Sequence, residues 1–230
     1  MSALLSIIVP VYNESATIGS VIDRLLTIDL PLDREVIVVN DGSTDGTREV
    51  LDKVAPGRKC VSVVHLPANR GKGHAVRVGL ARSEGTITAI QDADLELDPA
   101  QLKELVQPIL DGQADAVYGS RFLEPSFHVP LVTRVGNKTL TWMTNVLFGQ
   151  SLTDMETCYK IIRGDIARGL ELTADRFDIE PEITVALLRR GHRIVERPVT
   201  FSPRSRAAGK KMRWRDGIEA IRMLWRHRRG

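Results

Sequence analysis

The chain has 230 residues, of which 43% are hydrophobic and 27% charged, so it can fill a substantial core and does not have the composition of a disordered protein. No apolar run approaches the roughly 18–20 residues that span a bilayer, and the N-terminus lacks the basic segment and cleavage site of a signal peptide, so we expect a cytoplasmic protein. The net charge of +3 is uneven: residues 204–230 contain ten lysines or arginines and two acids, which favours an anionic surface or phosphate-bearing partner at that end.

The first half alternates short apolar runs rich in β-branched residues with amphipathic segments, a pattern that predicts βαβ units and a mostly parallel sheet. The expected strands cover residues 5–11, 35–39, 61–66, 86–91 and 115–119, and the expected helices cover 15–27, 44–54, 72–83 and 99–110. The candidate helix caps are Asn13 or Ser15, Ser43 or Thr44, and Asp98 before Pro99.

The second half begins with a helix-like segment over residues 131–149, whose apolar residues are too many for one narrow stripe. We expect a strand over 158–163, helices near 164–170 and 181–190, and a strand over 193–201. In the basic segment, Trp214, Ile218, Ile221 and Trp225 recur at helical intervals and predict an amphipathic helix. Cys60 and Cys158 form no C-x-x-C pair, so we expect reduced thiols, at least one of them in the core.

Polar clusters follow four successive strands: "YNE", "NDGSTDG", "ANRGKG" and "DADLE". The carboxyl ends of parallel strands lie at one edge of a sheet, so these clusters are expected to converge there. Known phosphate and calcium motifs do not account for them. The G-x-G-x-x-G fingerprint fails at Val76, no P-loop is present, and the calcium-loop spacing of "DGSTDG" is preceded by a strand rather than a helix.

Asp92 and Asp94 are two residues apart, so on a strand they would point the same way and offer hard oxygen ligands to Mg²⁺ or Mn²⁺. The glycine-rich loop with Lys72 would add backbone N–H donors and a positive charge for phosphates. Together these features predict a site for a nucleoside-diphosphate donor.

The four blocks "SIIVPVYNESATI", "EVIVVNDGSTDGT", "ANRGKGHAVRVGL" and "QDADLE" resemble glycosyltransferase family 2. The later blocks "YGSRF", "TDMETCYKIIR", "FDIEPEITVALLRRG" and "GKKMRWRDG" resemble its dolichyl-phosphate or polyprenyl-phosphate hexose synthase branch. The resemblance implies a GT-A fold, which is an α/β fold with a Rossmann-like, mostly parallel sheet flanked by helices, here with a C-terminal basic amphipathic helix. We expect a single domain over 1–230: a nucleotide-sugar-binding half (1–120), an acceptor-binding half (121–203), and a basic loop with an interfacial helix (204–230).

The resemblance also implies roles for individual residues. Those near the nucleotide are Pro10, Tyr12, Glu14, Asp41, Asn69, Gly71, Lys72 and Asp92. Asp92 and Asp94 would bind the metal, with Asp94 also counted as catalytic, and Glu96 stands where many relatives have glutamine, as a possible third ligand. Arg121 and Arg134 would hold the acceptor phosphate as catalytic cations. The basic loop that closes on donor and acceptor would contain Arg204, Arg206, Lys210 and Lys211.

The implied reaction is inverting transfer of a hexose from a GDP-mannose or UDP-glucose type of donor to a polyprenyl or dolichyl phosphate. A lipid monophosphate is already ionised near pH 7, its second pKa being about 6, so the enzyme needs cations more than a general base. Asp154 is a candidate base only for another class of acceptor.

Two alternatives stay open. One is a soluble family 2 glycosyltransferase acting on a sugar or other small molecule, and the other is a non-catalytic, membrane-associated binder of nucleotide sugars. For the lipid acceptor we expect a peripheral protein at the inner face of the cytoplasmic membrane, held by the basic helix, with no nucleic-acid partner. The alternative for this helix is packing on the body of the protein, and the stretch from Trp142 to Phe148 is either a second lipid contact or part of the core.

Overall fold

The computed structural model of the protein describes residues 3–123 and 131–203. Its elements follow in the order β1 (Leu4–Val11), α1 (Ile18–Thr27), β2 (Asp33–Asn40), α2 (Thr47–Val54), β3 (Val61–His65), α3 (Lys72–Leu80), β4 (Ile87–Ile90), the 3-10 helix η1 (Pro99–Gln101), α4 (Leu102–Leu110), β5 (Ala116–Ser120), α5 (Leu131–Phe148), β6 (Lys160–Arg163), α6 (Gly164–Arg168), α7 (Ile179–Arg189) and β7 (Ile194–Pro198).

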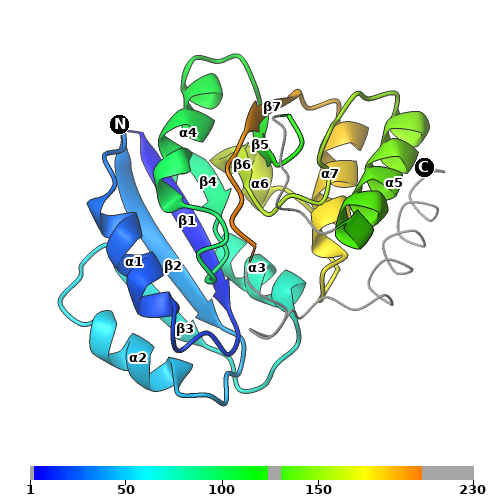
Figure 1. Ribbon diagram of the computed structural model, residues 1–230. Helices are drawn as coiled ribbons and strands as arrows, with labels where there is room; N and C mark the ends of the chain where they lie inside the picture. The colour runs from blue at the N-terminus through cyan, green and yellow to red at the C-terminus, as the bar shows by residue number, and fades with distance from the viewer. Residues whose placement is uncertain (1–2, 124–130, 204–230) are drawn as a thin grey trace.

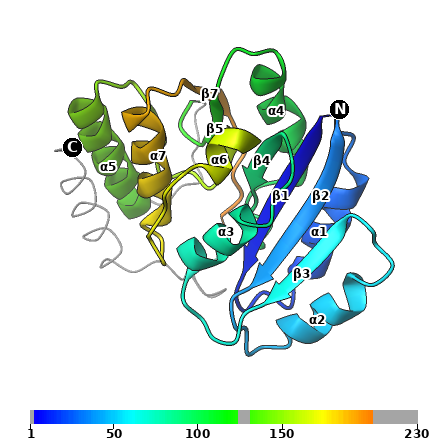
Figure 2. The ribbon, with the colours of Figure 1, turned by 180° about the vertical axis from the view of Figure 1, so that it is seen from behind.

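A seven-stranded sheet in the order β3-β2-β1-β4-β6-β5-β7 forms the centre of the fold. All neighbouring strands pair in parallel except β6, which is antiparallel to both β4 and β5. Helices α1 and α4 cover the face turned to the viewer in Figure 1, and α3 and α6 cover the opposite face, seen in Figure 2. The predicted mostly parallel α/β sheet flanked by helices is confirmed.

The central strand β1 is apolar on both faces because helices cover both sides of the sheet. Residues 5–11 are all buried, including Ile8 and Val9, and all except Ser6 are apolar, so hydrophobic residues do not alternate with polar ones along the strand. The helix α1 instead buries only one stripe at helical spacing, consisting of Ile18, Val21, Ile22 and Leu25. The change of period along the chain is therefore what distinguishes the strand from the helix that covers it.

The helix caps expected after β1 and β2 are wrong, because α1 and α2 begin later than expected. The residues concerned are Asn13, Ser15, Ser43 and Thr44. They join the two strand-end loops instead: Asn13 N donates to Ser43 Oγ (2.9 Å), and Thr44 N donates to Asn13 Oδ1 (2.8 Å). Short polar side chains can stabilise loops as well as helix ends, and here they form hydrogen bonds between loops instead of capping helices.

The cap at Asp98 is confirmed. Its Oδ1 accepts a hydrogen bond from Ala100 N (3.1 Å), and Pro99 occupies the first helical position, where no N–H is needed. The helix expected over 99–110 starts as the 3-10 turn η1 and continues as α4.

In the second half, α5 is the long helix that its sequence predicts, and it lies beside α7 in both views (Figures 1 and 2). Leu140, Met155 and Val185 form a small core between them, separate from the main one. Cys158 is buried and Cys60 half-buried, and both are free thiols, as expected.

No helix within residues 3–123 and 131–203 has the length and hydropathy of a membrane span. The expected basic loop and amphipathic helix, with Trp214, Ile218, Ile221 and Trp225, lie outside the described residues.

Candidate active site

The strand-end clusters converge at the carboxyl edge of the sheet, as expected for neighbouring parallel strands. The Thr17 hydroxyl donates to Ala93 O (2.7 Å) and so joins the segment after β1 to the loop after β4. Glu14 N donates to Thr47 Oγ1 (2.9 Å), which joins the segments after β1 and β2. The cluster after β3 is held to the same edge by Asp41.

Asp41, directly after β2, shapes the glycine-rich loop after β3. Its buried carboxylate accepts hydrogen bonds from Gly71 N (2.7 Å), Asn69 Nδ2 (2.9 Å) and Arg70 N (3.0 Å). Gly71 has φ of +115°, and a Cβ at this position would collide with the Asp175 carbonyl, so the loop requires glycine. Three of the expected nucleotide-binding residues thus form one rigid unit.

Four backbone N–H groups of this loop, which was expected to donate to phosphates, are already engaged within the protein. The N–H groups of residues 70 and 71 donate to Asp41, and those of residues 73 and 74 donate to the carbonyls of residues 176 (3.1 Å) and 175 (3.0 Å). These carbonyls belong to a segment about a hundred residues further along the chain, which packs against the start of α3. The loop therefore presents the Lys72 ammonium, rather than its amides, to the site.

Asp92 and Asp94 lie in a tight loop and not on a strand, because β4 ends at Ile90. Leu95 in this loop adopts the left-handed conformation (φ 60°), which bulky residues rarely take, and Asp94 Oδ1 accepts from Glu96 N (3.2 Å). Strand alternation therefore does not set the directions of the two aspartates. In the described ranges no three His, Cys, Asp or Glu side chains are grouped to hold a metal, so a role of Glu96 as a third ligand stays a prediction.

Two buried side chains that the sequence analysis did not single out hold this loop in place. Gln91 Nε2 donates to the carbonyls of Asp92 (3.0 Å) and Leu97 (3.3 Å). The Tyr159 hydroxyl, on the adjacent segment before β6, lies 2.7 Å from Gln91 Oε1 and 2.9 Å from Asp98 O. Nothing local in the sequence identifies this clamp, because its parts are 68 residues apart.

A chain of alternating charges runs from the loop into the second half of the molecule. Lys72 Nζ lies 2.8 Å from Asp92 Oδ1 and 2.8 Å from Glu180 Oε1. Lys160 Nζ, completely buried, lies 2.6 Å from Glu180 Oε2 and also donates to two backbone carbonyls. We call Asp92, Lys72, Glu180 and Lys160 the charge chain. Lys160 and Glu180 fall in the blocks "TDMETCYKIIR" and "FDIEPEITVALLRRG", but no pattern assigns them a role.

Three members of the charge chain, Asp92, Glu180 and Lys72, are ionised at neutral pH. Burial alone would raise the pKa of Asp92 and Glu180, but the neighbouring ammonium groups hold the pKa of both carboxyls below the usual range. Burial would likewise lower the pKa of Lys72, yet Asp92 and the other negative groups beside it keep that pKa well above its ordinary value. Burial also raises the pKa of Cys158 well above normal, so this thiol beside Asp92 stays protonated.

Arg121, just after β5, is bound to Asp154 in a two-pronged ion pair. Nε lies 2.7 Å from Oδ2 and Nη2 lies 2.8 Å from Oδ1, and the Arg121 backbone N–H adds a third bond of 3.0 Å. The Asp154 side chain is 0% exposed with both oxygens engaged, so it is not accessible as a general base, and that hypothesis is wrong. The Arg121 side chain is 12% exposed, and Nη1 is not used by the pair. Arg134 is exposed in the first turns of α5.

Glu156 lies near both buried ion pairs. Its Oε1 is buried and, within the described part of the chain, has no hydrogen-bond partner. Burial raises the pKa of Glu156 to about 7; Lys160 and Arg121 oppose this shift, while Glu180 and Asp154 add to it. This carboxyl therefore changes its charge close to neutral pH.

The other expected site residues are distributed as follows. Pro10 is buried within β1, and Tyr12 is half-buried beyond its end. Glu14 is buried, with Oε2 accepting from the Thr17 hydroxyl (3.0 Å). Arg204, Arg206, Lys210 and Lys211 lie outside the described residues.

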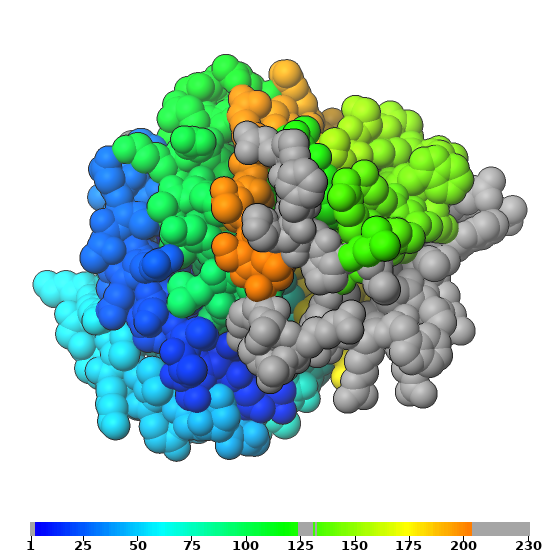
Figure 3. Space-filling model, viewed as in Figure 1, coloured from blue at the N-terminus to red at the C-terminus, as the bar shows by residue number. Residues whose placement is uncertain are grey.

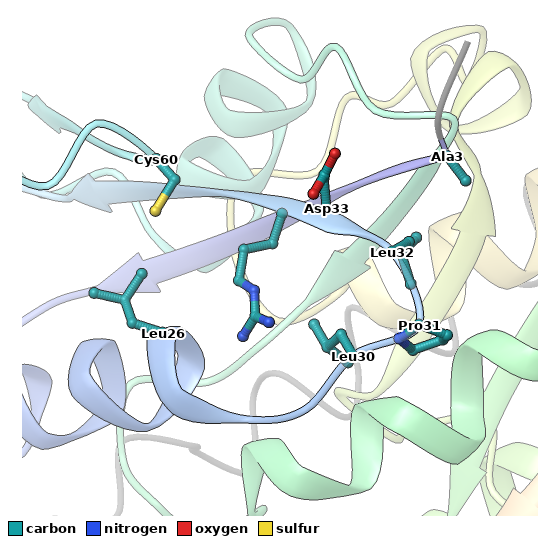
Figure 4. A pocket seen from close by; sticks show the side chains of 8 residues that line it. Ala3, Leu26, Leu30, Pro31, Leu32, Asp33 and Cys60 are labelled. Atoms are coloured by element: carbon teal, nitrogen blue, oxygen red, sulfur yellow. The ribbon is translucent and has the colours of Figure 1, made fainter.

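A separate hollow of about 670 Å³ lies at the other end of the sheet. Figure 4 shows its lining, which comes from the end of α1, the starts of β1 and β2, and Cys60 just before β3. Ligands of open α/β sheets bind at the carboxyl ends of the strands, so this hollow is not the expected site.

The residues present fit a divalent cation. Asp92 and Asp94 offer the hard carboxylate oxygens that Mg²⁺ and Mn²⁺ prefer, and the Asp92 side chain is 29% exposed. Two protein carboxylates leave the other coordination positions to water and phosphate oxygens, the usual arrangement where Mg²⁺ binds together with a nucleotide. The Lys72 ammonium beside Asp92 shows that this carboxylate already accepts a cation.

Comparison with known proteins agrees with the geometry. The family model described as Glycosyl transferase family 2 matches residues 6–165, more than half of the chain. The undecaprenyl-phosphate mannosyltransferase of Micrococcus luteus is 31% identical over 88% of this chain and 85% of its own length. The low-salt glycan biosynthesis hexosyltransferase Agl6 of Haloferax volcanii is 27% identical over 97% of this chain, which spans only about half (52%) of that protein.

Among solved structures, glucosyl-3-phosphoglycerate synthase from Mycobacterium tuberculosis, crystallised with Mn²⁺, UDP and phosphoglyceric acid, shares the fold. Its TM-score is 0.73 at 22% identity, over 99% of this chain and 79% of that one. The chain belongs to glycosyltransferase family 2 and is a glycosyltransferase.

Proposed function

We propose that this glycosyltransferase moves a hexose, with inversion and with the help of a divalent metal, from a GDP-mannose or UDP-glucose type of donor to a polyprenyl or dolichyl phosphate. The observation that carries the donor half of the proposal is the meeting of Asp92, Lys72 and the Asp41-held loop at the carboxyl edge of the sheet. The acceptor half is supported by the undecaprenyl-phosphate mannosyltransferase, which resembles this chain over most of both lengths.

On the donor side, Asp92 and Asp94 would hold the cation, and Pro10, Tyr12, Glu14, Asn69 and Gly71 would line the nucleoside around Asp41. When bound, Mg²⁺ or Mn²⁺ supplies the positive charge that stabilises the leaving nucleoside diphosphate. Lys72 adds a second positive charge beside it, from a side chain that is 13% exposed. The Gln91–Tyr159 clamp keeps the aspartate loop in one geometry, which favours charge stabilisation without reorganisation.

On the acceptor side, the nucleophile is an already ionised phosphate, so the site needs positive charge rather than a base. The burial of Asp154 in its pair with Arg121 agrees with this, because the carboxylate cannot take a proton from a sugar hydroxyl. Arg121 would hold the acceptor phosphate through Nη1, assisted by Arg134 and by the basic residues Arg204, Arg206, Lys210 and Lys211.

A screen of donors against acceptors tests the proposal directly. The purified chain is given GDP-mannose, UDP-glucose and related donors, with Mg²⁺, Mn²⁺ or EDTA, and either a polyprenyl phosphate or simple sugars. We expect hexose transfer to the polyprenyl phosphate, and we expect EDTA to abolish this transfer. Asp92→Ala and Asp94→Ala should each reduce the rate of transfer by roughly a thousandfold or more. Transfer to the simple sugars alone would replace the lipid acceptor by a small-molecule one, and nucleotide-sugar binding without any transfer would point to a non-catalytic binder.

We also propose that the protein works at an anionic membrane surface. On α5, the apolar residues Leu131, Val135, Trp142 and Val146 recur along one face and are exposed, Trp142 to 64%. Figure 3 shows α5 (light green) at the surface of the molecule. Arg134 and Lys138 on the same helix are also exposed, and each basic residue near an anionic surface contributes about 1 kcal/mol. The protein is expected to sediment with anionic liposomes and not with neutral ones, and Trp142→Ser should weaken this sedimentation. Equal sedimentation of the wild type and the Trp142→Ser variant would reject a role for α5.

A further inference from the structure

The charge chain places a lysine ammonium where the site is expected to accept a metal. Lys72 Nζ touches Asp92 Oδ1 at 2.8 Å, and Asp92 is one of the two carboxylates assigned above to the cation. In the charge chain the two lysines balance Asp92 and Glu180. A divalent cation added to this partly buried group would leave an excess of positive charge, unless an anion came with it.

The two ends of the charge chain differ in what happens when Lys72 moves away. Glu180 keeps Lys160, which lies 2.6 Å from it and is fixed by backbone carbonyls. Asp92, which is the more exposed of the two carboxylates, has no second lysine or arginine in ion-pair contact among the residues that the structure describes. Release of Lys72 is therefore tolerated at Glu180, whereas at Asp92 it has to be matched by another cation.

The position of Lys72 in the fold favours such a release. Lys72 is the first residue of α3, and a positive charge at a helix N-terminus is opposed by the helix dipole. The two carboxylates overcome this effect in the structure. A diphosphate arriving at the same edge of the sheet would offer Lys72 an equivalent negative partner.

We propose that Lys72 is a resident counter-cation of the metal site: it occupies Asp92 in the metal-free protein and passes to the donor diphosphate when metal and nucleotide bind together. The consequence is that the metal binds weakly alone and strongly with a nucleoside diphosphate, so that Asp92 is not loaded with metal before the donor arrives. This inference rests on the proposed metal role of Asp92 and Asp94.

The test measures Mn²⁺ affinity by the electron paramagnetic resonance of unbound Mn²⁺, first without nucleotide and then with UDP or GDP. Lys72→Met should bind Mn²⁺ alone at least about tenfold more tightly than the wild type, because a repelling charge beside Asp92 is removed. With UDP or GDP present, the difference in Mn²⁺ affinity between Lys72→Met and the wild type should shrink or reverse, because the variant lacks the ammonium group that would bind the diphosphate. Lys72→Arg, which keeps the charge, should bind Mn²⁺ alone as weakly as the wild type.

Two further variants separate the possible outcomes. Glu180→Gln removes the second carboxylate beside Lys72 and should weaken Mn²⁺ binding several-fold. This effect is opposite in direction to that of Lys72→Met, so either variant tests the inference if the other does not fold. Lys103→Met is the matched control, since Lys103 pairs with Asp29 on the surface, and it should leave the affinity unchanged.

Asp92→Asn distinguishes failure of this inference from failure of the proposed function. If it binds Mn²⁺ as the wild type does, the metal assignment itself is wrong. If it loses binding while Lys72→Met shows no gain, Lys72 does not compete with the metal and this inference alone is overturned.

Discussion

The two halves of the sheet carry their charges in different places. Around β1, β2 and β4 the interior is apolar, and the acidic residues of the site stand in the loops beyond the strand ends. From β5 onward, ion pairs are part of the interior: Lys160 with Glu180, and Arg121 with Asp154. The first half is therefore stabilised mainly by hydrophobic burial, whereas the second half depends on each buried charge keeping its partner.

The largest effect is expected where one partner of a buried pair is removed. Lys160→Met leaves Glu180 with Lys72 alone and two carbonyls without their donor, and should lower the free energy of unfolding by about 3–5 kcal/mol. Urea unfolding followed by circular dichroism measures this. Lys103→Met, at an exposed pair that water screens, should change the free energy of unfolding far less. Equal losses in the two variants would show that burial of the charge is irrelevant.

The Arg121–Asp154 pair either adds to the stability of the fold or only offsets the cost of burying its own two charges. Asp154→Asn leaves the largely buried guanidinium without its counter-charge and should cost about 3 kcal/mol. The double variant Arg121→Met/Asp154→Leu should recover most of this loss, because buried pairs replaced by apolar residues are often neutral in stability. A double variant as unstable as the single one would assign the pair a net stabilising role.

Glu156 makes the second half sensitive to pH. Its pKa is raised to about 7 from 4.5, so the folded state prefers the protonated form. The contribution to stability is complete below about pH 4.5 and is lost as the pH rises through 7. Glu156→Gln, which cannot ionise, should therefore be about 3 kcal/mol more stable than the wild type at pH 8, and less than about 1 kcal/mol more stable at pH 5. A stability difference independent of pH would contradict the shift.

The smallest effect is expected in the first half. Ile8→Val removes one methylene from the fully buried centre of β1 and should cost about 0.5–1.5 kcal/mol. Since no ionisable group is involved, the loss should be the same at pH 5 and pH 8. A loss that varied with pH would mean that the apolar interior is coupled to the charged half.

Much of the site's outline follows from local sequence patterns. β-branched runs and amphipathic segments predict the parallel sheet, and parallel strands bring the clusters around Asp41, Lys72 and Asp92 to one edge. Asp98 caps its helix because the cap needs only a neighbouring N–H. These features depend on residues a few positions apart, which is why the sequence can report them.

The parts that sequence reasoning missed are contacts between distant segments. The amides at the start of α3 are taken by the carbonyls of residues 175 and 176, and the aspartate loop is clamped by Tyr159. Asp92 and Asp94 were expected to point the same way from strand alternation, but the strand ends at Ile90 and the turn at Leu95 redirects the chain. In each case a tertiary contact or a turn overrides a periodic expectation.

The sequence by itself determined the family, through the resemblance of its sequence blocks. It also determined the order of strands and helices along the chain and which polar residues stand at the strand ends, because hydrophobic period and turn chemistry are local properties. Only the tertiary structure decided what those residues touch. Lys72 was expected to face a phosphate, and in the fold it bridges Asp92 and Glu180, which is 108 positions away from it in the chain. A buried charge is stable only with an opposite charge within a few ångströms, and the identity of that partner depends on how distant segments pack.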